Sequence, residues 1–216
     1  MQPTLAGFLY FNRGDLNTFA RLLDMSCYTL QTPLDEEDVR KLKLGDTVAI
    51  DGRIFTARDA AHKYMAGDPD PGRLPDFTGG IIYHCGPVIV RNDDGWRVTA
   101  AGPTTSTREE PYEACVIEKY GIRAIIGKGG MGPATLEACR RFGCVYLHAI
   151  GGAAQILANA VKQVSSVYFL EEFGAPEAIW QFEVRDFPAV VTMDASGNSL
   201  HSRVLEHSLA QFEKLK

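Results

Sequence analysis

The chain lacks several features that would place it in large functional classes. None of its apolar runs approaches the ~20 residues that a membrane-spanning helix needs. No basic cluster accompanies its formal net charge of −5, which argues against general nucleic-acid binding. The N-terminal stretch has no basic start, apolar core and cleavage site of the secretory kind. We therefore expect a cytoplasmic protein that binds neither membranes nor nucleic acids.

Cysteine is also scarce, and its spacing is uninformative for metal binding. The five cysteines form no CxxC pair and no ferredoxin-like run of three or four thiols. Cys139 and Cys144 fall on an expected helix and on the loop after it, which is more typical of small buried side chains than of ligands. The sequence thus predicts no metal or cluster site built by this chain. The cysteines are Cys27, Cys85, Cys115, Cys139 and Cys144.

The length, the composition and the order of the expected elements indicate one α/β domain of ordinary size. The 216 residues are 45% hydrophobic and 23% charged, which is enough for a sizeable core. Early hairpins followed by alternating strands and helices predict a mixed sheet layered with helices. We expect strands at 47–50, 53–56 (after an Asp51-Gly52 hairpin turn), 80–84, 88–91, 96–100, 122–126, 144–148, 165–170, 180–185 and 190–193. We expect helices from Thr32 or Asp35 to residue 42, and at 111–120, 133–142, 153–160 and 204–215.

The segment AIIGKGGMGPATLEA, from Ala124 to Ala138, joins an apolar run to a helix through a glycine-dense turn. The start of a helix leaves backbone N–H groups free and favours an anion there. Lys128 lies in this turn, so either a carboxylate site or a tight turn with a solvated lysine fits the pattern. A P-loop does not fit, because Gly129 occupies the position where that motif needs Ser or Thr.

Two further segments carry cationic and hydroxyl groups. In AGPTTSTR, four consecutive hydroxyl residues lie between the Gly102-Pro103 break and Arg108. In TARDAAH, Arg58 stands at an expected strand-to-helix junction. Arg58, Arg108 and Lys128 together would suit a small dicarboxylate, because arginine forms bidentate bonds to carboxylates and lysine adds a point charge. Each of these residues taken singly is more typical of a surface charge.

The chain resembles the β region of class I, iron–sulfur-dependent fumarate hydratases and of their tartrate dehydratase relatives. Four motifs carry this resemblance: GPTTSTR, GKGGMGP, TARDAAH and HAIGGAA. The resemblance runs from about Thr29 to about His201 and includes the whole of Phe173 to Asn198. It implies a swivelling β/β/α-type fold for a domain spanning 29–216.

Residues 1–28 share no motif with that family. Leu16 to Met25 has the apolar spacing of a short amphipathic helix. Two interpretations stand side by side. Either Met25 is an alternative start of the protein, or the segment is an additional helix that packs on the domain.

The resemblance implies a two-component hydro-lyase that reversibly hydrates fumarate to L-malate, a reaction of the tricarboxylic acid cycle. In that family a [4Fe-4S] cluster with one open iron acts as Lewis acid. The resemblance assigns this cluster to an α subunit, which this chain would meet in a hetero-oligomer; a homodimer is the other assembly it allows. All cluster ligands and the second acid/base group would come from that partner.

The family's site residues carry over to matching positions of this chain. Arg58, Arg108 and Lys128 would bind the substrate carboxylates, and Thr104 would be the acid/base at the carbon that exchanges its proton. Because a threonine hydroxyl is a poor base, it needs a neighbouring cation, and Arg58 is the best candidate. Many relatives carry methionine where this chain has Glu109.

Two alternatives remain open from the sequence. The chain could be a β subunit of L(+)-tartrate dehydratase, although Ile150–Ala154 and Glu177–Trp180 look more like fumarases. It could also be a dicarboxylate-binding module without catalysis.

Other polar residues receive plainer interpretations. His62, four residues after Arg58, suggests a helix-surface or capping role. His84 is explained by a strand end entering a turn, and the pair Glu109 and Glu110 is expected to be solvated. Trp180, among apolar neighbours, is expected in the core.

Overall fold

The computed structural model describes residues 27–93 and 95–215. The expected helix at Leu16–Met25 and the alternative start at Met25 lie outside these described residues. The strands are β1 Cys27–Gln31, β2 Thr47–Thr56, β3 Ile81–Tyr83, β4 Val88–Asn92, β5 Gly95–Ala100, β6 Ala124–Gly127, β7 Val145–His148, β8 Val161–Tyr168 and β9 Ile179–Met193. The helices are α2 Glu36–Lys41, α3 Asp59–Ala66, α4 Glu110–Tyr120, α5 Pro133–Phe142, α6 Ala154–Ala160, α7 Leu170–Phe173 and α8 Leu200–Glu213, with short 3₁₀ turns η2 Pro71–Arg73 and η3 Ser106–Arg108.

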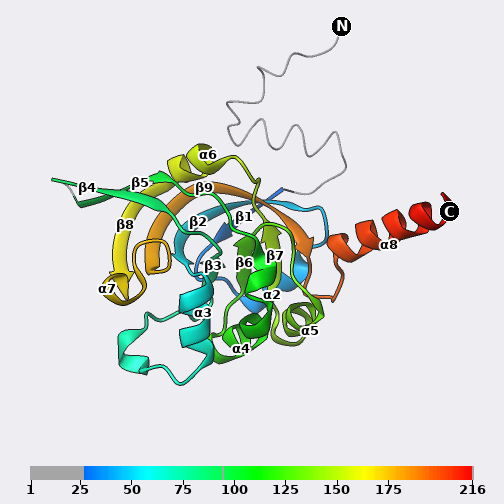
Figure 1. Ribbon diagram of the computed structural model, residues 1–216, viewed down its shortest axis with the longest axis horizontal. Helices are drawn as coiled ribbons and strands as arrows, with labels where there is room; N and C mark the ends of the chain where they lie inside the picture. Colours follow the sequence, from blue (N-terminus) through cyan, green and yellow to red (C-terminus); the bar gives the residue numbers. More distant parts are fainter. Residues whose placement is uncertain (1–26, 94, 216) are drawn as a thin grey trace, which may run out of the picture.

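Seven strands form one mixed sheet in the order β1-β2-β3-β6-β7-β9-β8, so the expected mixed sheet layered with helices is confirmed (Figure 1). The strands from β1 to β7 in this order are parallel to their neighbours. The long strand β9 runs antiparallel to β7, to β8 and also to β2. Its pairing with β2 closes β2, β3, β6, β7 and β9 into a ring, while β4 and β5 form a separate hairpin.

The core lies in two layers because successive side chains of a strand point to opposite faces. On β3, β6 and β7, every residue is buried except His148 at the end of β7, as expected for parallel strands covered on both faces. Alternate residues therefore enter different hydrophobic clusters. One cluster contains Ile81, Tyr83, Ala124, Ile126, Val145, Leu147 and Trp180; the other contains Ile82, Ile125 and Tyr146 with residues from α3, α4 and α5.

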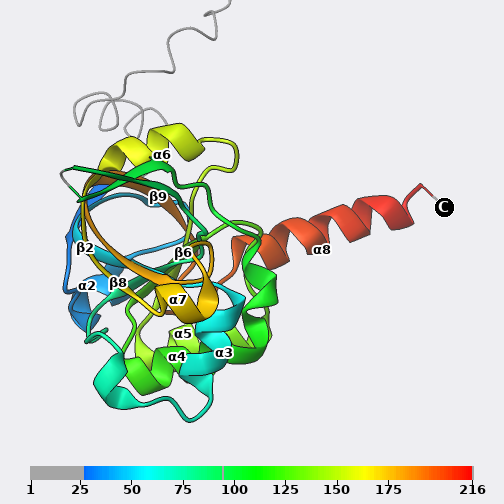
Figure 2. The ribbon, with the colours of Figure 1, turned by 60° about the vertical axis from the view of Figure 1, so that its left-hand side comes forward.

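The helices divide between the two sides of the ring. Helices α3, α4 and α5 lie together on one side, and α6 lies on the opposite side beside β5 and β9 (Figure 2). Helix α8 projects from the body, and its large apolar side chains Leu200, Val204, Leu205, Leu209 and Phe212 are exposed, as is Leu215 just after it. None of the helices within the described residues has the length and apolarity needed to cross a bilayer.

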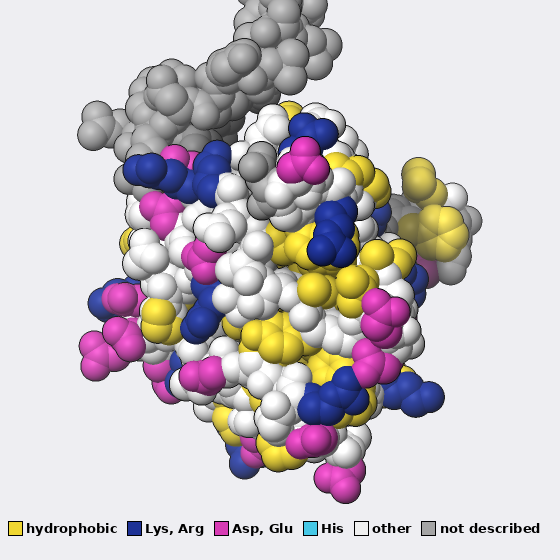
Figure 3. All heavy atoms as spheres, turned by 90° about the vertical axis from the view of Figure 1, so that its left-hand side faces the viewer, with side chains coloured by type: hydrophobic (Ala, Val, Ile, Leu, Met, Phe, Trp, Pro, Cys, Tyr) yellow, Lys and Arg dark blue, Asp and Glu magenta, His cyan; other side chains and the backbone are white. Residues whose placement is uncertain are grey.

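The face over the β4–β5 hairpin, β8 and α7 carries apolar patches among charges of both signs (Figure 3). Val88 and Val90 of β4 contribute exposed apolar surface here. The charges on this face are interspersed rather than gathered into one basic surface.

The structure corrects the expected hairpin at Asp51-Gly52. β2 is one strand from Thr47 to Thr56, because both of its halves pair with β9. The register shifts between Ile50 and Gly52, and Gly52 adopts φ +97°, so this glycine forms a bulge rather than a turn. For the same reason, the two strands expected at 180–185 and 190–193 are a single β9.

The first helix begins later than Thr32. Helix α2 starts at Glu36 with Asp35 at the N-cap position, which confirms the second of the two expected starts. Thr32 instead continues the edge of the sheet, since its N–H donates to the Asp51 carbonyl and its hydroxyl accepts from the Arg53 N–H. A residue engaged in this way is unavailable as a cap.

Glu110 was expected to be solvated, and this prediction is wrong. Its carboxylate caps the start of α5, accepting hydrogen bonds from the N–H groups of Gly132, Ala134 and Thr135 at 2.7, 3.0 and 3.2 Å. It also accepts from the Thr135 hydroxyl at 2.7 Å. One side chain thus satisfies three of the free donors at the helix start, in the turn that follows Lys128.

We therefore predict that Glu110→Ala lowers the free energy of unfolding by about 1–3 kcal/mol, because four donors at the start of α5, three of them in part-buried hydrogen bonds, lose their acceptor. Glu110→Gln should lose about half as much, since one amide oxygen still accepts. Urea unfolding measures both, with Glu118→Ala on the exposed face of the same helix as the control. A Glu110→Ala variant as stable as Glu118→Ala would contradict the capping role.

Candidate functional site

The carboxyl ends of the four parallel strands β2, β3, β6 and β7 meet at one edge of the sheet. The residues that follow them are Arg58, His84, Lys128 and the loop after His148. In sheets with parallel strands, ligands bind outside the carboxyl ends of the strands. The residues singled out in the sequence therefore fall at the edge where a ligand site is expected.

Arg58 and Arg108 lie together through a shared acid. Asp59 Oδ2 is 3.0 Å from Arg108 Nη2 and 3.8 Å from Arg58 Nη2. Arg58 Nη2 also lies 3.3 Å from Glu177 Oε1. Arg58 is 20% exposed and Arg108 is 45% exposed at the side chain, so both guanidinium groups can reach a ligand that comes from solvent.

The Arg58 side chain lies against Gly86. A Cβ at Gly86 would come within 2.6 Å of Arg58 Nη1 and 2.8 Å of the Pro176 carbonyl oxygen, so only glycine leaves room for the guanidinium. The adjacent Cys85 pairs with Pro103 in an isolated antiparallel bridge. This bridge places the segment under Arg58 directly beside Thr104.

The four hydroxyls of 104–107 have different surroundings. Thr104 is half-buried, and both its N–H (2.7 Å) and its hydroxyl (3.1 Å) donate to the His84 carbonyl. Ser106 is fully buried, whereas Thr105 and Thr107 are exposed. Thr104 is therefore the one hydroxyl of the four that is both held in place and open to the site.

Lys128 is a backbone neighbour of Thr104. Its N–H donates to the Thr104 carbonyl at 3.3 Å, and its own carbonyl accepts from the Ser106 N–H at 3.0 Å. The half-buried side chain runs along Gly151, where a Cβ would stand 3.6 Å from Lys128 Cδ. The four predicted site residues thus lie on adjoining segments, and their roles remain predictions.

Behind these residues lies a buried charged cluster that the sequence interpretation missed. His62, His84, Glu109 and Glu113 are each 0% exposed. His62 was expected to have a helix-surface or capping role and Glu109 to be solvated; the surface and solvated positions are wrong, because α3 and the start of α4 pack these side chains against each other. The available signal was spacing, since Glu109, at the N-cap position of α4, and Glu113 are four residues apart.

The two buried carboxyl groups titrate in opposite directions. Burial raises the pKa of Glu109 to about 7. His62, with Nδ1 4.0 Å from Glu109 Oε2, and Arg108 act to lower this pKa. Asp59 and Glu113 act with burial to raise it. Burial would also raise the pKa of Glu113, but His62 and His84 outweigh it and hold this pKa at about 2. Glu113 is accordingly ionised, and Glu109 changes charge near neutral pH.

Two more histidines border the Lys128 loop from the other side. The His201 ring, at the start of α8, is bonded through Nε2 to Thr192 Oγ1 at 3.0 Å and lies 6.2 Å from the His148 ring. A Cβ at Gly130 would meet the His201 ring at 2.5 Å. This contact and the φ of +78° require glycine at position 130.

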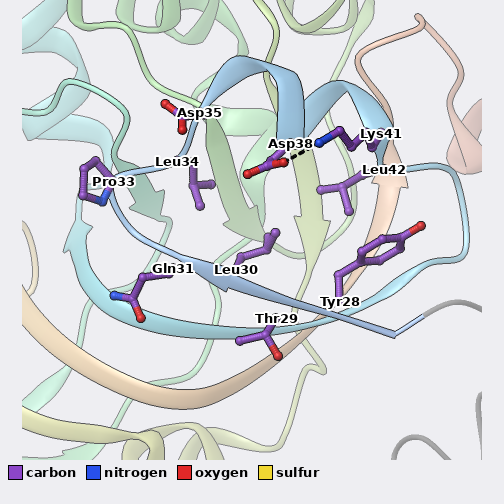
Figure 4. A pocket seen from close by; sticks show the side chains of 10 residues that line it. All are labelled: Tyr28, Thr29, Leu30, Gln31, Pro33, Leu34, Asp35, Asp38, Lys41 and Leu42. Carbon is purple, nitrogen blue, oxygen red and sulfur yellow. Dashed lines mark hydrogen bonds and ion pairs between the residues drawn. The ribbon is translucent and has the colours of Figure 1, made fainter.

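The described surface also has a hollow away from these residues. It lies between β1 and α2, and Figure 4 shows its lining, which includes the Lys41–Asp38 ion pair of 2.7 Å. None of Arg58, Thr104 or Lys128 lines it. A hollow whose charges are paired locally offers little to bind a dicarboxylate, so we place the site at the carboxyl edge of the sheet.

The thiols of the described residues do not fit an iron–sulfur cluster. Cys85 is buried in one hydrophobic cluster, and Cys139 and Cys144 lie together in the other. Cys115 is exposed on α4, and Cys27 is half-buried on β1. Within 27–93 and 95–215, the one group of three His, Cys, Asp or Glu side chains whose donor atoms all lie within 4.8 Å is His62, His84 and Glu113. A cluster needs three or four thiolates together.

Comparison with known proteins places these features in a family. A family model described as "Fumarase C-terminus" matches residues 17–204, a match that begins upstream of residue 29, where we expected the resemblance to start. A putative fumarate hydratase class I of Geobacillus stearothermophilus is 53% identical over 189 residues, which are 87% of this chain and 36% of that protein. The chain thus spans about a third of the length of that relative.

Shorter relatives match over most of their length. A putative L(+)-tartrate dehydratase subunit beta of Methanocaldococcus jannaschii is 47% identical over 174 residues, 79% of this chain and 89% of that protein. The L(+)-tartrate dehydratase subunit beta of Escherichia coli (strain K12) is 36% identical over 173 residues, 79% of this chain and 85% of that protein.

The buried Glu109 carboxyl leads to a prediction about pH and stability. Because its pKa is raised in the folded state to about 7 from an ordinary 4.5, the folded protein favours the protonated form. Its contribution to stability is complete below pH ~4.5, falls as the pH rises to about 7 and stays low above that value. Glu109→Gln should therefore raise the free energy of unfolding by about 1–3 kcal/mol at pH 8 and by little at pH 5.

Denaturant unfolding at both pH values tests this prediction. Glu118→Gln, exposed on the same helix, is the control and should change stability equally at pH 5 and pH 8. If Glu109→Gln also shows no pH-dependent gain, Glu109 is not the buried titrating group described above.

Proposed function

Because this chain belongs to the fumarase C-terminus family, we propose that it is the β-type part of a hydro-lyase that reversibly hydrates fumarate to L-malate. The observation that carries this proposal is the arrangement at the sheet edge, with two arginines on one aspartate beside a held threonine hydroxyl and Lys128. A dicarboxylate presents two anionic groups, and this edge presents three cations.

Binding would begin with exchange of ion-pair partners. In the protein alone, Asp59 lies within 3.0 Å of Arg108 and 3.8 Å of Arg58. A substrate carboxylate would replace Asp59 at these guanidinium groups and gain bidentate hydrogen bonds. Lys128 would hold the second carboxylate from the neighbouring loop.

The proton step would use Thr104. Removing the proton beside a carboxylate places negative charge on that group, and the arginine pair would stabilise this aci-carboxylate as it forms. In the hydration direction the Thr104 hydroxyl would give its proton to the carbon beside this carboxylate and be left as an alkoxide, and in the dehydration direction the alkoxide would take that proton back. Arg58, held beside the 103–104 segment through Gly86, supplies the positive charge that a threonine needs for this role.

The remaining half of the site would come from an α-type partner. The family resemblance implies a [4Fe-4S] cluster, and the cysteines described above do not fit one. We therefore assign the cluster to the partner, from which it would supply a Lewis acid to the shared site. The same partner would supply the second acid/base group and form a hetero-oligomer with this chain.

A tartrate dehydratase subunit beta is the second candidate. Relatives so named match this chain over 85–89% of their own length, whereas the relative named fumarate hydratase has the higher identity, 53%. The segments Ile150–Ala154 and Glu177–Trp180 favour fumarate. Comparing the two substrates with the assembled protein decides between them, and binding without turnover of either would leave a dicarboxylate-binding module.

We predict that the chain purified alone is colourless and inactive on fumarate and malate. Iron–sulfur absorbance and hydratase activity should appear only after anaerobic reconstitution with an α-type partner, because this chain's thiols do not gather into a cluster site. Absorbance and the fumarate–malate assay provide the measurement. A brown and active preparation of the chain alone would refute the two-component proposal.

Removing a cationic anchor should cost catalysis in the assembled enzyme. Arg108→Ala and Lys128→Ala each delete a charge-assisted contact, for an expected loss of about 2–4 kcal/mol of transition-state stabilisation. This corresponds to roughly 30- to 1000-fold in kcat/KM. Arg140→Ala, which removes an exposed arginine paired with Glu137, is the matched control; losses no greater than its own would show that the two anchors are surface charges.

Thr104→Val keeps the side-chain shape and deletes the hydroxyl. We expect kcat to fall by about 10²-fold or more with a smaller change in KM, as for a lost acid/base group. The exposed Thr107→Val should have a much smaller effect. Solvent exchange of the malate C3 proton, followed by NMR, measures the step directly. If Thr104→Val exchanges the malate C3 proton at the normal rate while Thr105→Val or Ser106→Ala does not, the acid/base role belongs to another hydroxyl.

A further inference from the structure

Five buried polar side chains behind the site form one continuous chain, in which three links are hydrogen bonds and the His62–Glu113 link is an ion-pair contact. They come from five different elements: His62 from α3, Glu113 from α4, His84 from the end of β3, Ser106 from η3 and Tyr146 from β7. All five are 0% exposed. Such a chain is expensive to bury, and replacing a buried ion pair by apolar residues is often neutral or stabilising. Its presence therefore calls for a reason other than stability.

The distances define the order of the chain. Glu113 Oε2 lies 3.1 Å from His62 Nε2 and 2.9 Å from His84 Nε2. His84 Nδ1 lies 2.9 Å from Ser106 Oγ, and the Tyr146 hydroxyl donates to the same Oγ at 2.8 Å. Both histidines thus meet at a single carboxylate oxygen.

The charges of the chain follow from its surroundings. Burial acts to lower the pKa of His62, but Glu113 and Glu109 outweigh it and raise this pKa; burial prevails at His84 and lowers its pKa. The chain accordingly holds a charged His62, an ionised Glu113 and a neutral His84. Neutral His84 then donates through Nε2 to Glu113 and accepts through Nδ1 from the Ser106 hydroxyl.

Each histidine also bonds to one residue of the predicted acid/base pair. His62 Nδ1 donates to the Arg58 carbonyl at 3.0 Å. The His84 carbonyl accepts both the N–H and the hydroxyl of Thr104, at 2.7 and 3.1 Å. The chain therefore joins the backbone of Arg58 to the side chain of Thr104 across the boundary between α3 and the 101–108 loop.

We propose that His62 and His84, joined through Glu113, are positioning residues that set the distance between the Arg58 cation and the Thr104 hydroxyl. The inference rests on the proposed function for the roles of Arg58 and Thr104. Its physical reason is that a weak base such as threonine depends on a cation at a fixed place, and a misplacement of ~1 Å costs about 10²-fold in rate. Two segments far apart in the sequence need a direct connection to hold such a distance.

Two substitutions of His62 separate its two contacts. Asn places its amide nitrogen near the position of Nδ1, so His62→Asn keeps the donor to the Arg58 carbonyl and loses the contact with Glu113. Gln places its amide nitrogen near Nε2, so His62→Gln keeps the contact with Glu113 and loses the donor to Arg58. The helical hydrogen bond from the His62 N–H to the Arg58 carbonyl remains in both variants.

Positioning predicts that the two variants lose activity alike although they differ in stability. Each variant removes one of the two links between Arg58 and Glu113, so both should lower kcat of the assembled enzyme by about 10- to 100-fold. His62→Asn should nevertheless have the lower Tm, because the buried Glu113 loses its charged partner. His207→Asn and His207→Gln, on the exposed face of α8, control for the substitutions themselves.

If kcat simply follows Tm across the two His62 variants, the cluster is structural and the proposal is wrong. A wild-type assembly that hydrates no dicarboxylate would refute the proposed function instead. The chain alone still tests the positioning in that case: the NMR signals of the Arg58 guanidinium should shift in both His62 variants, and wild-type positions in either variant would overturn the inference.

A measurement on the wild-type chain covers the case in which a variant fails to fold. Ring ¹⁵N signals near pH 7 should show His62 doubly protonated and His84 neutral with its proton on Nε2. Two neutral rings, or a stoichiometric metal ion in the purified chain with both rings as its ligands, would contradict the chain of contacts described here.

Discussion

The pairing of β2 with β9 is the constraint on which the rest of the fold depends. β2 pairs with β1, β3 and β9, and β9 pairs in turn with β7 and β8. This closure brings β7 back toward β2, so that the carboxyl ends of β2, β3, β6 and β7 face one another. An open sheet with the same strands would spread those ends along a line, and residues after the outer strands would be too far apart to share a ligand.

Closure also explains why charged side chains are buried directly behind the site. The face of the ring that packs against α3, α4 and α5 presents Ile82, Ile125 and Tyr146, which excludes water from the space where α3 and α4 meet. His62 and Glu113 are enclosed there with His84 and must neutralise one another, because an unpaired buried charge is costly. Glu109 has no comparable partner, so it favours its protonated form at pH values where an exposed glutamate is ionised.

The site itself is cationic within an acidic chain. Two guanidinium groups converge on Asp59, and the adjoining loops carry Thr104 and Lys128. Such an edge can bind a dicarboxylate and exchange a proton with it, but the described thiols do not gather for cluster chemistry. This division of labour agrees with relatives named as beta subunits and gives the partner-dependent proposal its chemical basis.

The sequence by itself determined the local chemistry of this protein. The glycine-rich turn around Lys128, the Gly-Pro break before Thr104 and the helix 133–142 were all readable, because backbone turns and helix ends depend on residues close in the chain. What the tertiary structure alone decided was burial and pairing. Local pattern predicts a solvated Glu109 and a helix-surface or capping role for His62, yet packing of α3 on the start of α4 encloses both side chains. Asp51-Gly52 has the pattern of a hairpin, but pairing of both halves of β2 with β9 makes it a bulge. These outcomes depend on residues far away in the sequence, whose approach no local pattern records.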